Sequence, residues 1–191
     1  MVNLTRIYTR TGDDGTTALG DMSRTSKLDK RLAAYADVDE ANSTIGVAVA
    51  AGDLSDEIAT LLVRIQNDLF DVGADLCTPL SEPGGDTASL RVEDSYIEFL
   101  EEQCDRFNEG LEKLRSFILP GGTPGAAFLH QARTVARRAE RATWAALEEH
   151  GETMNSNTVK YLNRLSDLLF ILARQANVAR GDVLWQPGAN R

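Results

Sequence analysis

Cysteine is scarce in this chain: its 191 residues include only Cys77 and Cys104. The two lie far apart in the sequence and form no CxxC pair, which argues against a metal site built on thiolates. Free cysteines behave as small buried apolar residues, and they persist as thiols in reducing compartments. We therefore expect both to be reduced and buried, in a cytoplasmic protein.

Long apolar runs are missing as well. No window approaches the roughly 18 uninterrupted apolar residues that a membrane span requires. The first residues, MVNLTRIYTRTGDDG, contain no apolar stretch typical of a secretory signal. These absences predict a soluble protein with no membrane partner.

Positive charge is in the minority: 20 Lys and Arg face 29 Asp and Glu, for a net charge of −9. Such a surplus of carboxylates argues against a general nucleic-acid partner. Four arginines nevertheless gather within residues 133–141, in the stretch HQARTVARRAERATWA. They predict a site for a local anion and not for a long polyanion.

Apolar residues recur at three- and four-residue spacing in several segments, and no segment with a period of two is long enough for a sheet. The expected helices cover residues 30–51, 53–76, 91–111, 124–149 and 154–178. This pattern predicts an all-α, five-helix bundle that forms a single domain. Residues 1–27 would form a Gly/Thr-rich N-terminal loop, 28–178 the bundle, and 179–191 an irregular tail.

The fourth expected helix has two different sides. One side carries mainly small apolar residues: Phe128, Leu129, Ala132, Val135, Ala136, Ala139, Ala142 and Ala146. The other carries His130, Arg133, Arg137, Glu140, Arg141 and Trp144. Three of those arginines are spaced four residues apart and repel one another unless an anion offsets them. Either an exposed face with ion pairs or forked contacts to a phosphate would explain them.

The fifth expected helix also combines an apolar and a polar stripe. Its apolar stripe consists of Leu162, Leu165, Leu168, Leu169, Leu172 and Ala176. Its polar stripe consists of Asn163, Asp167, Phe170, Arg174 and Asn177. A bound ligand or a polar network inside the bundle would each account for this stripe, and the sequence leaves both open.

The N-terminal stretch YTRTGDDGTTALG, residues 8–20, has the composition of an anion-binding loop. Gly12 and Gly15 let backbone amides approach an anion, and Thr9, Thr11, Thr16 and Thr17 supply hydroxyls. The chain contains no GxxxxGK[ST] pattern, so this is not a Walker A loop. An ordinary turn would also account for these residues.

Several motifs, in this order and spacing, resemble the PduO-type ATP:cob(I)alamin adenosyltransferases. They are IYTRTGDDGTT, AYADVDEANSTIG, FILPGG, HQARTVARRAER and YLNRLSDLLFILAR, and the similarity runs over about residues 5–178. The resemblance implies a homotrimer of five-helix bundles with active sites at the subunit interfaces. It also implies that cob(I)alamin, formed through a four-coordinate state, attacks C5′ of ATP to give adenosylcobalamin and triphosphate.

The resemblance also implies an ATP site. Carried over by position, its residues are Thr9, Arg10, Thr11, Gly12, Thr17, Ala18, Lys27, Arg137, Arg138, Glu140, Arg141 and Asn163. The arginines would stabilise the departing triphosphate. Mg²⁺ would accompany the triphosphate, with Glu140 as its candidate ligand.

A cobalamin site is implied beside it. Asp39 and Arg133 match an acid–arginine pair that joins two subunits next to the corrin. Phe117 matches the aromatic residue that keeps the dimethylbenzimidazole base off the cobalt, and Phe170 matches a hydrophobic contact on that side. The implied catalytic set is Arg133, Arg137, Asp39 and Phe117. Without the resemblance, either phenylalanine could belong to the core.

Two segments depart from the family pattern. The N-terminal motif more usually reads TKTGDKG, whereas this chain has Arg10 and Asp14, so a phosphate contact from position 14 is not expected. The tail matches poorly; we assign no site to Trp185, although a lid over the corrin would be compatible with its position. The expected partners are a flavin reductant protein and an adenosylcobalamin-dependent acceptor enzyme.

Two other functions occur on helical bundles of this kind. The same scaffold without catalysis would hold adenosylcobalamin for delivery or act as an ATP-responsive partner. A ferritin-like di-metal bundle would need Glu-x-x-His pairs. Ala127 and Leu147 precede His130 and His150 at that spacing, which excludes a di-metal site of that kind.

Overall fold

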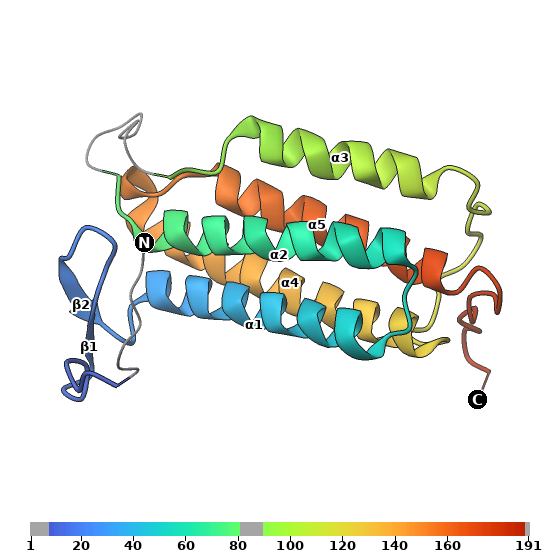
Figure 1. The fold of residues 1–191 in the computed structure, drawn as a ribbon, viewed down its shortest axis with the longest axis horizontal. Coiled ribbons are helices and arrows are strands. Elements are labelled where there is room, and N and C mark those ends of the chain that lie inside the picture. Colours follow the sequence, from blue (N-terminus) through green and yellow to red (C-terminus); the bar gives the residue numbers. More distant parts are fainter. Residues whose placement is uncertain (1–7, 81–89, 190–191) are drawn as a thin grey trace.

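The computed structural model describes residues 8–80 and 90–189, and within them the chain is an elongated helical bundle (Figure 1). The elements are β1 (Thr16–Ala18), β2 (Arg24–Ser26), α1 (Lys30–Ala51), α2 (Asp56–Cys77), α3 (Asp94–Asn108), α4 (Pro124–His150), the 3₁₀ turn η1 (Gly151–Thr153) and α5 (Asn157–Ala176). The predicted all-α, five-helix fold is confirmed.

Side-chain caps explain where three of the helices begin. Asp29 caps α1, Ser55 caps α2, and Thr123 caps α4, each by accepting a hydrogen bond from a backbone amide of the first turn. Pro124 follows Thr123 as the first residue of α4, where its missing N–H is not needed. The start of α4 is therefore set by the PGGTPG sequence that interrupts the helical pattern.

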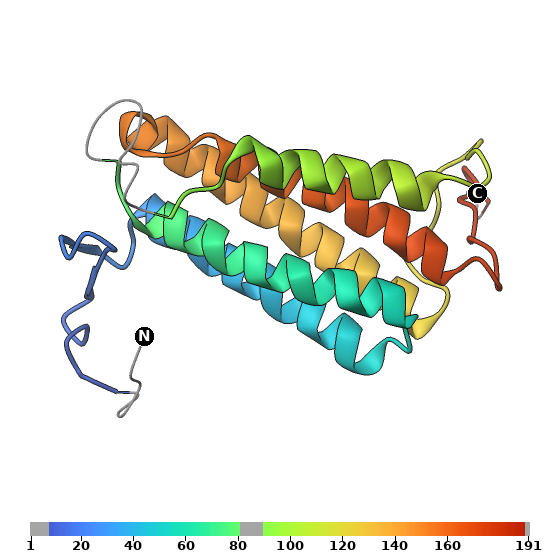
Figure 2. The ribbon, with the colours of Figure 1, turned by 45° about the horizontal axis from the view of Figure 1, so that its top comes forward.

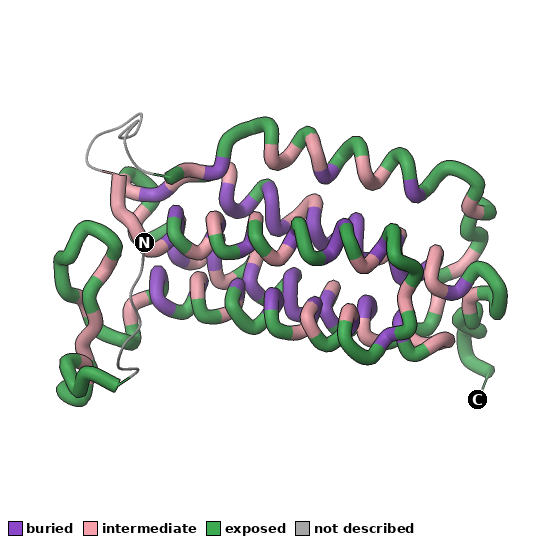
Figure 3. Tube along the Cα trace, in the orientation of Figure 1, coloured by how far each residue is buried: buried purple, intermediate pink, exposed green. Residues whose placement is uncertain are grey.

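The core lies where α5 packs between α4 and α3, and where α1 packs between α2 and α4. The five leucines of the α5 stripe are fully buried, as are Ala132, Ala136 and Ala139 of α4, and Ala176 at the end of the stripe is half-buried. Buried residues line the inner sides of the helices, while α3 shows a mostly exposed outer side (Figure 3). Only Leu100 and Phe107 of α3 are buried, so α3 is a peripheral helix.

The two ends of the bundle carry different attachments. A small antiparallel hairpin of β1 and β2 lies beyond one end, and the tail after α5 lies beyond the other (Figures 1 and 2). The hairpin is anchored by a hydrogen bond from Gly20 N to Cys77 O, 2.8 Å. This two-stranded sheet contradicts the expectation of no sheet, because strands of three residues are too short to show a period of two.

The tail is also more ordered than expected. Ile118 and Leu184 form an isolated antiparallel bridge, and Leu119 N and Trp185 N donate to Val183 O and Phe117 O, each at 2.8 Å. The tail therefore pairs with the segment before α4.

The cysteines lie on separate helices, α2 and α3, and both are free thiols. They are half-buried and not fully buried, because Cys77 ends α2 and Cys104 lies on the peripheral helix α3. Burial raises the pKa of the Cys104 thiol to about 11, which makes that thiol unreactive at neutral pH. Among the described residues, none of the helices is sufficiently long and apolar to cross a membrane.

Candidate functional site

Two arginines of α4 line a cavity of about 710 Å³ between α4, α5 and the segment after α3. Arg133 and Arg137 lie on its wall with Asp167 and Phe170 of α5. The Nε of Arg133 is buried without a hydrogen-bond partner, and neither arginine forms an ion pair with the described residues. Burial, and next the charge of Arg137, lower the pKa of Arg133. Neither guanidinium group therefore has an ion-pair partner among the described residues, although Asp167 and Glu112 also line the cavity.

A neighbouring cavity of about 500 Å³ lies further along α4, between α3, α4 and α5. Glu140 and Asn163 line it together with Trp144, and Asn163 Nδ2 donates to Glu140 Oε1 at 3.2 Å. Mg²⁺ in nucleotide sites is commonly held by one or two carboxylates, phosphate oxygens and waters. Glu140 fits this role, because its carboxylate faces a cavity and forms no ion pair with the described residues.

Arg138 points to a different neighbour from Arg137. It pairs with Asp37, at 3.4 Å, and with Glu40, both on α1. The hydrogen bond to Glu40 raises the pKa of Arg138. Arg138 therefore follows the first of the two explanations for the arginines, an exposed face with ion pairs. Arg133 and Arg137 form no ion pair with the described residues. Arg141 is exposed and also forms no ion pair within the described part of the chain.

The N-terminal segment forms a compact structure of its own. Thr17 and Ala18 lie in β1, opposite Thr25 and Arg24 of β2. A Cβ built on Gly12 would lie 2.9 Å from the backbone oxygen of Thr16 and 3.0 Å from Lys27 Nζ, so a larger residue at position 12 would force the backbone of this turn to shift. The hydroxyls of Thr9 and Thr11 are 3.0 Å apart, and Arg10 next to them has a positive φ of 61°.

Asp14 has partners inside this segment. It accepts hydrogen bonds from the backbone N and the hydroxyl of Thr16, at 3.0 and 2.7 Å, and lies 3.7 Å from Arg24. These hydrogen bonds lower the pKa of Asp14. The residue that departs from the family motif therefore stabilises the turn before β1.

Within one chain, the two halves of the expected ATP site are not brought together. Residues 9–28 form no hydrogen bond or ion pair with the arginine-bearing turns of α4 in the part of the chain that the structure describes. The hairpin lies beyond the end of the bundle (Figure 2), while Arg133 and Arg137 lie beside α5. Both halves are open to another molecule.

Of the expected cobalamin residues, Arg133 and Phe170 line the same cavity, whereas Asp39 and Phe117 are not among the residues that line it. Asp39 is exposed on α1 and forms no ion pair with the described residues. Phe117 is 78% exposed and its ring lies 6.0 Å from that of Trp185, so it is not a core residue. Phe170 is half-buried, lines the larger cavity, and contacts the buried ring of His130.

The polar stripe of α5 divides into two parts with different roles. Asn163, Asp167 and Phe170 face the two cavities. Arg174 and Asn177 are buried in a polar network: Arg174 pairs with Asp182 at 2.9 Å, and Asn177 bonds Gly121 O and Thr123 N. For Arg174 and Asn177 the stripe is thus a polar network, one of the two explanations left open by the sequence, and their partners lie in the tail and in the loop before α4.

Comparisons with known proteins agree with this geometry. Residues 7–176 match the family model described as cobalamin adenosyltransferase. The chain is 60% identical over 190 residues to the corrinoid adenosyltransferase of Mycobacterium tuberculosis, covering 100% of this chain and 97% of that protein. It is 47% identical over 187 residues to the cobalamin adenosyltransferase of Cupriavidus metallidurans, covering 96% and 95%.

A solved structure of a relative has the same fold as this chain. It is a phenylalanine-to-alanine variant of the PduO-type ATP:corrinoid adenosyltransferase from Lactobacillus reuteri, in complex with cobalamin and ATP. That structure matches with a TM-score of 0.86 and 36% identity, over 95% of this chain and 99% of that one. The chain therefore belongs to the cobalamin adenosyltransferase family.

Proposed function

We propose that this protein transfers the 5′-deoxyadenosyl group of ATP to cob(I)alamin. The cobalt–carbon bond forms as the C5′–oxygen bond of ATP breaks, and inorganic triphosphate leaves. The observation that carries this proposal is the pair Arg133 and Arg137, which line one cavity beside Phe170 and form no ion pair with the described residues. Family membership and relatives solved with cobalamin and ATP support the same reaction.

The leaving group explains why arginines are needed. Triphosphate departs with several negative charges, and forked guanidinium donors bind phosphate oxygens in two-point contacts. Arg137 and Arg141 would bind the triphosphate, and fixed donors that stabilise charge developing in the transition state usually supply much of a catalytic rate. Mg²⁺ bound with the triphosphate, with Glu140 as ligand, would neutralise part of its charge.

The N-terminal segment would supply the other half of the ATP site. Its residues are Thr9, Arg10, Thr11, Gly12, Thr17, Ala18 and Lys27, with Arg138 and Asn163 from the bundle. Since residues 9–28 do not reach the arginines of their own chain, we place the site between two subunits of a homotrimer. Asp39 of one subunit would then pair with Arg133 of the next, which would supply the missing counter-charge.

The cobalamin would lie beside Phe117 and Phe170. An exposed aromatic ring such as Phe117 can occupy the lower face of the corrin and keep the dimethylbenzimidazole base away from the cobalt. Removal of that ligand would raise the cobalt(II)/cobalt(I) potential, so that a cellular reductant could supply the one electron that converts cob(II)alamin to the cob(I)alamin nucleophile. We place the reaction in the cytoplasm, with a flavin protein as reductant and an adenosylcobalamin-dependent enzyme as acceptor.

The test is an anaerobic assay with ATP, Mg²⁺ and chemically reduced cob(I)alamin that measures adenosylcobalamin and triphosphate. We expect turnover by the wild type, a loss of at least about 100-fold in kcat/KM for Arg137→Ala, and partial recovery in Arg137→Lys. Arg106→Ala is the matched control, because Arg106 is an exposed arginine that pairs with Glu57, away from both cavities. Tight binding of cobalamin without turnover would indicate that the protein is a carrier and not an enzyme.

A further inference from the structure

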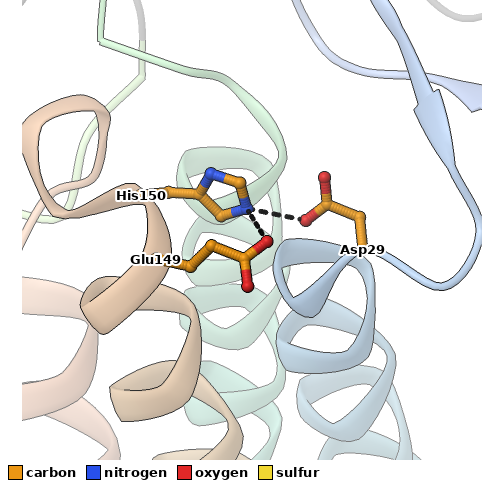
Figure 4. Close-up of side chains that lie close together, drawn as sticks. All are labelled: Asp29, Glu149 and His150. Carbon is orange, nitrogen blue, oxygen red and sulfur yellow. Dashed lines mark hydrogen bonds and ion pairs between the residues drawn. The ribbon is translucent and has the colours of Figure 1, made fainter.

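Asp29, Glu149 and His150 come together where the end of α4 meets the start of α1 (Figure 4). His150 Nε2 lies 2.9 Å from Asp29 Oδ1 and 3.4 Å from Glu149 Oε1. The cluster lies outside both cavities described above, and nothing in the adenosyl transfer requires it. It therefore needs its own explanation.

Hydrogen bonding accounts for this cluster better than a metal ion does. Asp29 Oδ1 also accepts from Arg31 N at 2.8 Å, and Asp29 Oδ2 accepts from the Thr25 hydroxyl at 2.7 Å. The Oε2 of Glu149 pairs with Lys30 Nζ at 3.1 Å. Each carboxylate is thus already occupied by protein donors.

Asp29 is the point at which three elements meet. Through Thr25 it contacts β2, through Arg31 N it caps α1, and through His150 it contacts the last residue of α4. Thr25 is the register partner of Thr17, and Lys27 lies two residues before Asp29. The contacts of Asp29 therefore set how the hairpin leaves the bundle.

The surroundings make this junction rigid on the bundle side. Arg31 is 2% exposed and donates to Leu76 O, Thr153 O and the Thr153 hydroxyl. These bonds join α1 to the end of α2 and to η1, directly after His150. On the hairpin side, the Gly20–Cys77 backbone bond is the other described anchor to the bundle. Loss of the Asp29–His150 contact would leave the hairpin with fewer fixed points.

We propose that the Asp29–His150 contact is a positioning device for the ATP-binding segment. His150 holds Asp29, Asp29 holds Thr25, and the hairpin thereby presents Thr17 and Lys27 in a fixed orientation. His150 is the last residue of the helix that also carries Arg137 and Arg141. The Asp29–His150 contact therefore fixes the hairpin relative to the arginines of the same chain, and each of these two parts contributes to an ATP site. This inference rests on the proposed function, and His150 is a positioning residue that does not touch substrate.

The test compares three variants in the anaerobic assay. We expect His150→Ala to raise the KM for ATP about tenfold, while kcat at saturating ATP stays within about twofold and the KM for cobalamin is unchanged. His150→Gln can offer an amide donor to Asp29 and should recover most of the ATP affinity. Glu149→Gln is the matched control, since it changes the neighbouring side chain and leaves the Asp29–His150 contact in place.

Hydrogen exchange gives a readout that does not depend on catalysis. We expect faster exchange of the backbone amides in residues 16–27 in His150→Ala than in the wild type, with exchange in α5 unchanged. Unchanged ATP KM and unchanged exchange in an active protein would overturn the inference. So would an equal loss for both substrates with faster exchange throughout the bundle, which would indicate general destabilisation. A wild type without turnover would instead overturn the proposed function.

Discussion

His130 belongs to the arginine-bearing side of α4 in the sequence pattern, but its side chain is buried in the structure. It is 2% exposed and, in the part of the chain that the structure describes, neither ring nitrogen has a hydrogen-bond partner. Burial, and next the charge of Arg133, lower the pKa of His130 from its usual value of 6.5. The imidazole is therefore neutral in the folded protein at neutral pH.

This environment predicts an acid-sensitive fold. Between the lowered pKa and 6.5, the unfolded chain binds a proton at His130 that the folded chain does not, so stability falls as the pH drops below about 6.5. We expect His130→Leu to reduce this dependence and to leave stability at neutral pH equal or up to about 1 kcal/mol higher, because a buried unpaired polar group is removed. Urea unfolding at several pH values measures both effects.

A different group would be responsible if His130→Leu kept the full loss of stability below pH 6.5. Carboxylates with lowered pKa values, such as Asp29, lose their contribution at lower pH. Burial raises the pKa of Asp29, but hydrogen bonds from Thr25, Arg31 N and His150 outweigh it. Its contribution is complete above the unfolded value of 3.8 and disappears below it.

At the scale of elements, α4 is shaped for close approach. It packs against α1 and α5. The alanines Ala132, Ala136 and Ala139 are fully buried in these contacts, while Arg133 and Arg137 face the large cavity. The same helix therefore supplies a tight packing side and a charged side.

An added side chain on the packing side should be costly. We expect Ala139→Leu to lower the free energy of unfolding by about 1–3 kcal/mol, because extra methylenes have no space in a close-packed interior. Ala127→Leu on the exposed side of the same helix should change it by less than about 0.5 kcal/mol. Similar values for the two variants, measured by urea unfolding, would show that α4 is loosely packed.

The sequence predicted the elements that depend on local pattern. The helical period placed all five helices, within a few residues of their observed ends, because caps and periodicity are local signals. Contacts between distant segments carried no such signal: β1 and β2 are too short, and the Ile118–Leu184 bridge and the Arg174–Asp182 pair join segments far apart in the chain. The Asp29–His150 contact also joins residues far apart in the chain, so the sequence did not predict it.

The types and spacing of the residues predicted only part of the candidate site. The spacing of Arg133 and Arg137 predicted an unbalanced charged face, which the structure shows. It could not distinguish Arg137 from Arg138, because the partners of Arg138 are on α1. The ATP and cobalamin assignments came from resemblance and stay predictions.

At the scale of the whole molecule, the separation of the hairpin from the arginines predicts complementation between subunits. Lys27→Ala and Arg137→Ala should each be nearly inactive alone. When the two variants are co-expressed, about one quarter of the sites in randomly mixed trimers would combine an intact hairpin with intact arginines. We therefore expect the unfractionated mixture to recover about one quarter of wild-type kcat, and purified trimers that contain both variants, each with one intact site of three, to recover about one third.

Sites formed within a single chain would give the opposite result. Each mixed trimer would then contain only defective sites, and activity would stay at the level of the separate variants. Chains that carry both substitutions, mixed with wild type, provide the control for assembly. A monomer with full activity would contradict the interface site directly.

The pairing of the tail with the segment before α4 has a consequence for the order of folding. The helices α4 and α5 are adjacent in sequence and pack after closing a short loop, whereas the bridge between Ile118 and Leu184 must close a long one. We therefore expect the surroundings of Phe117 to form later in folding than the packing of α4 against α5.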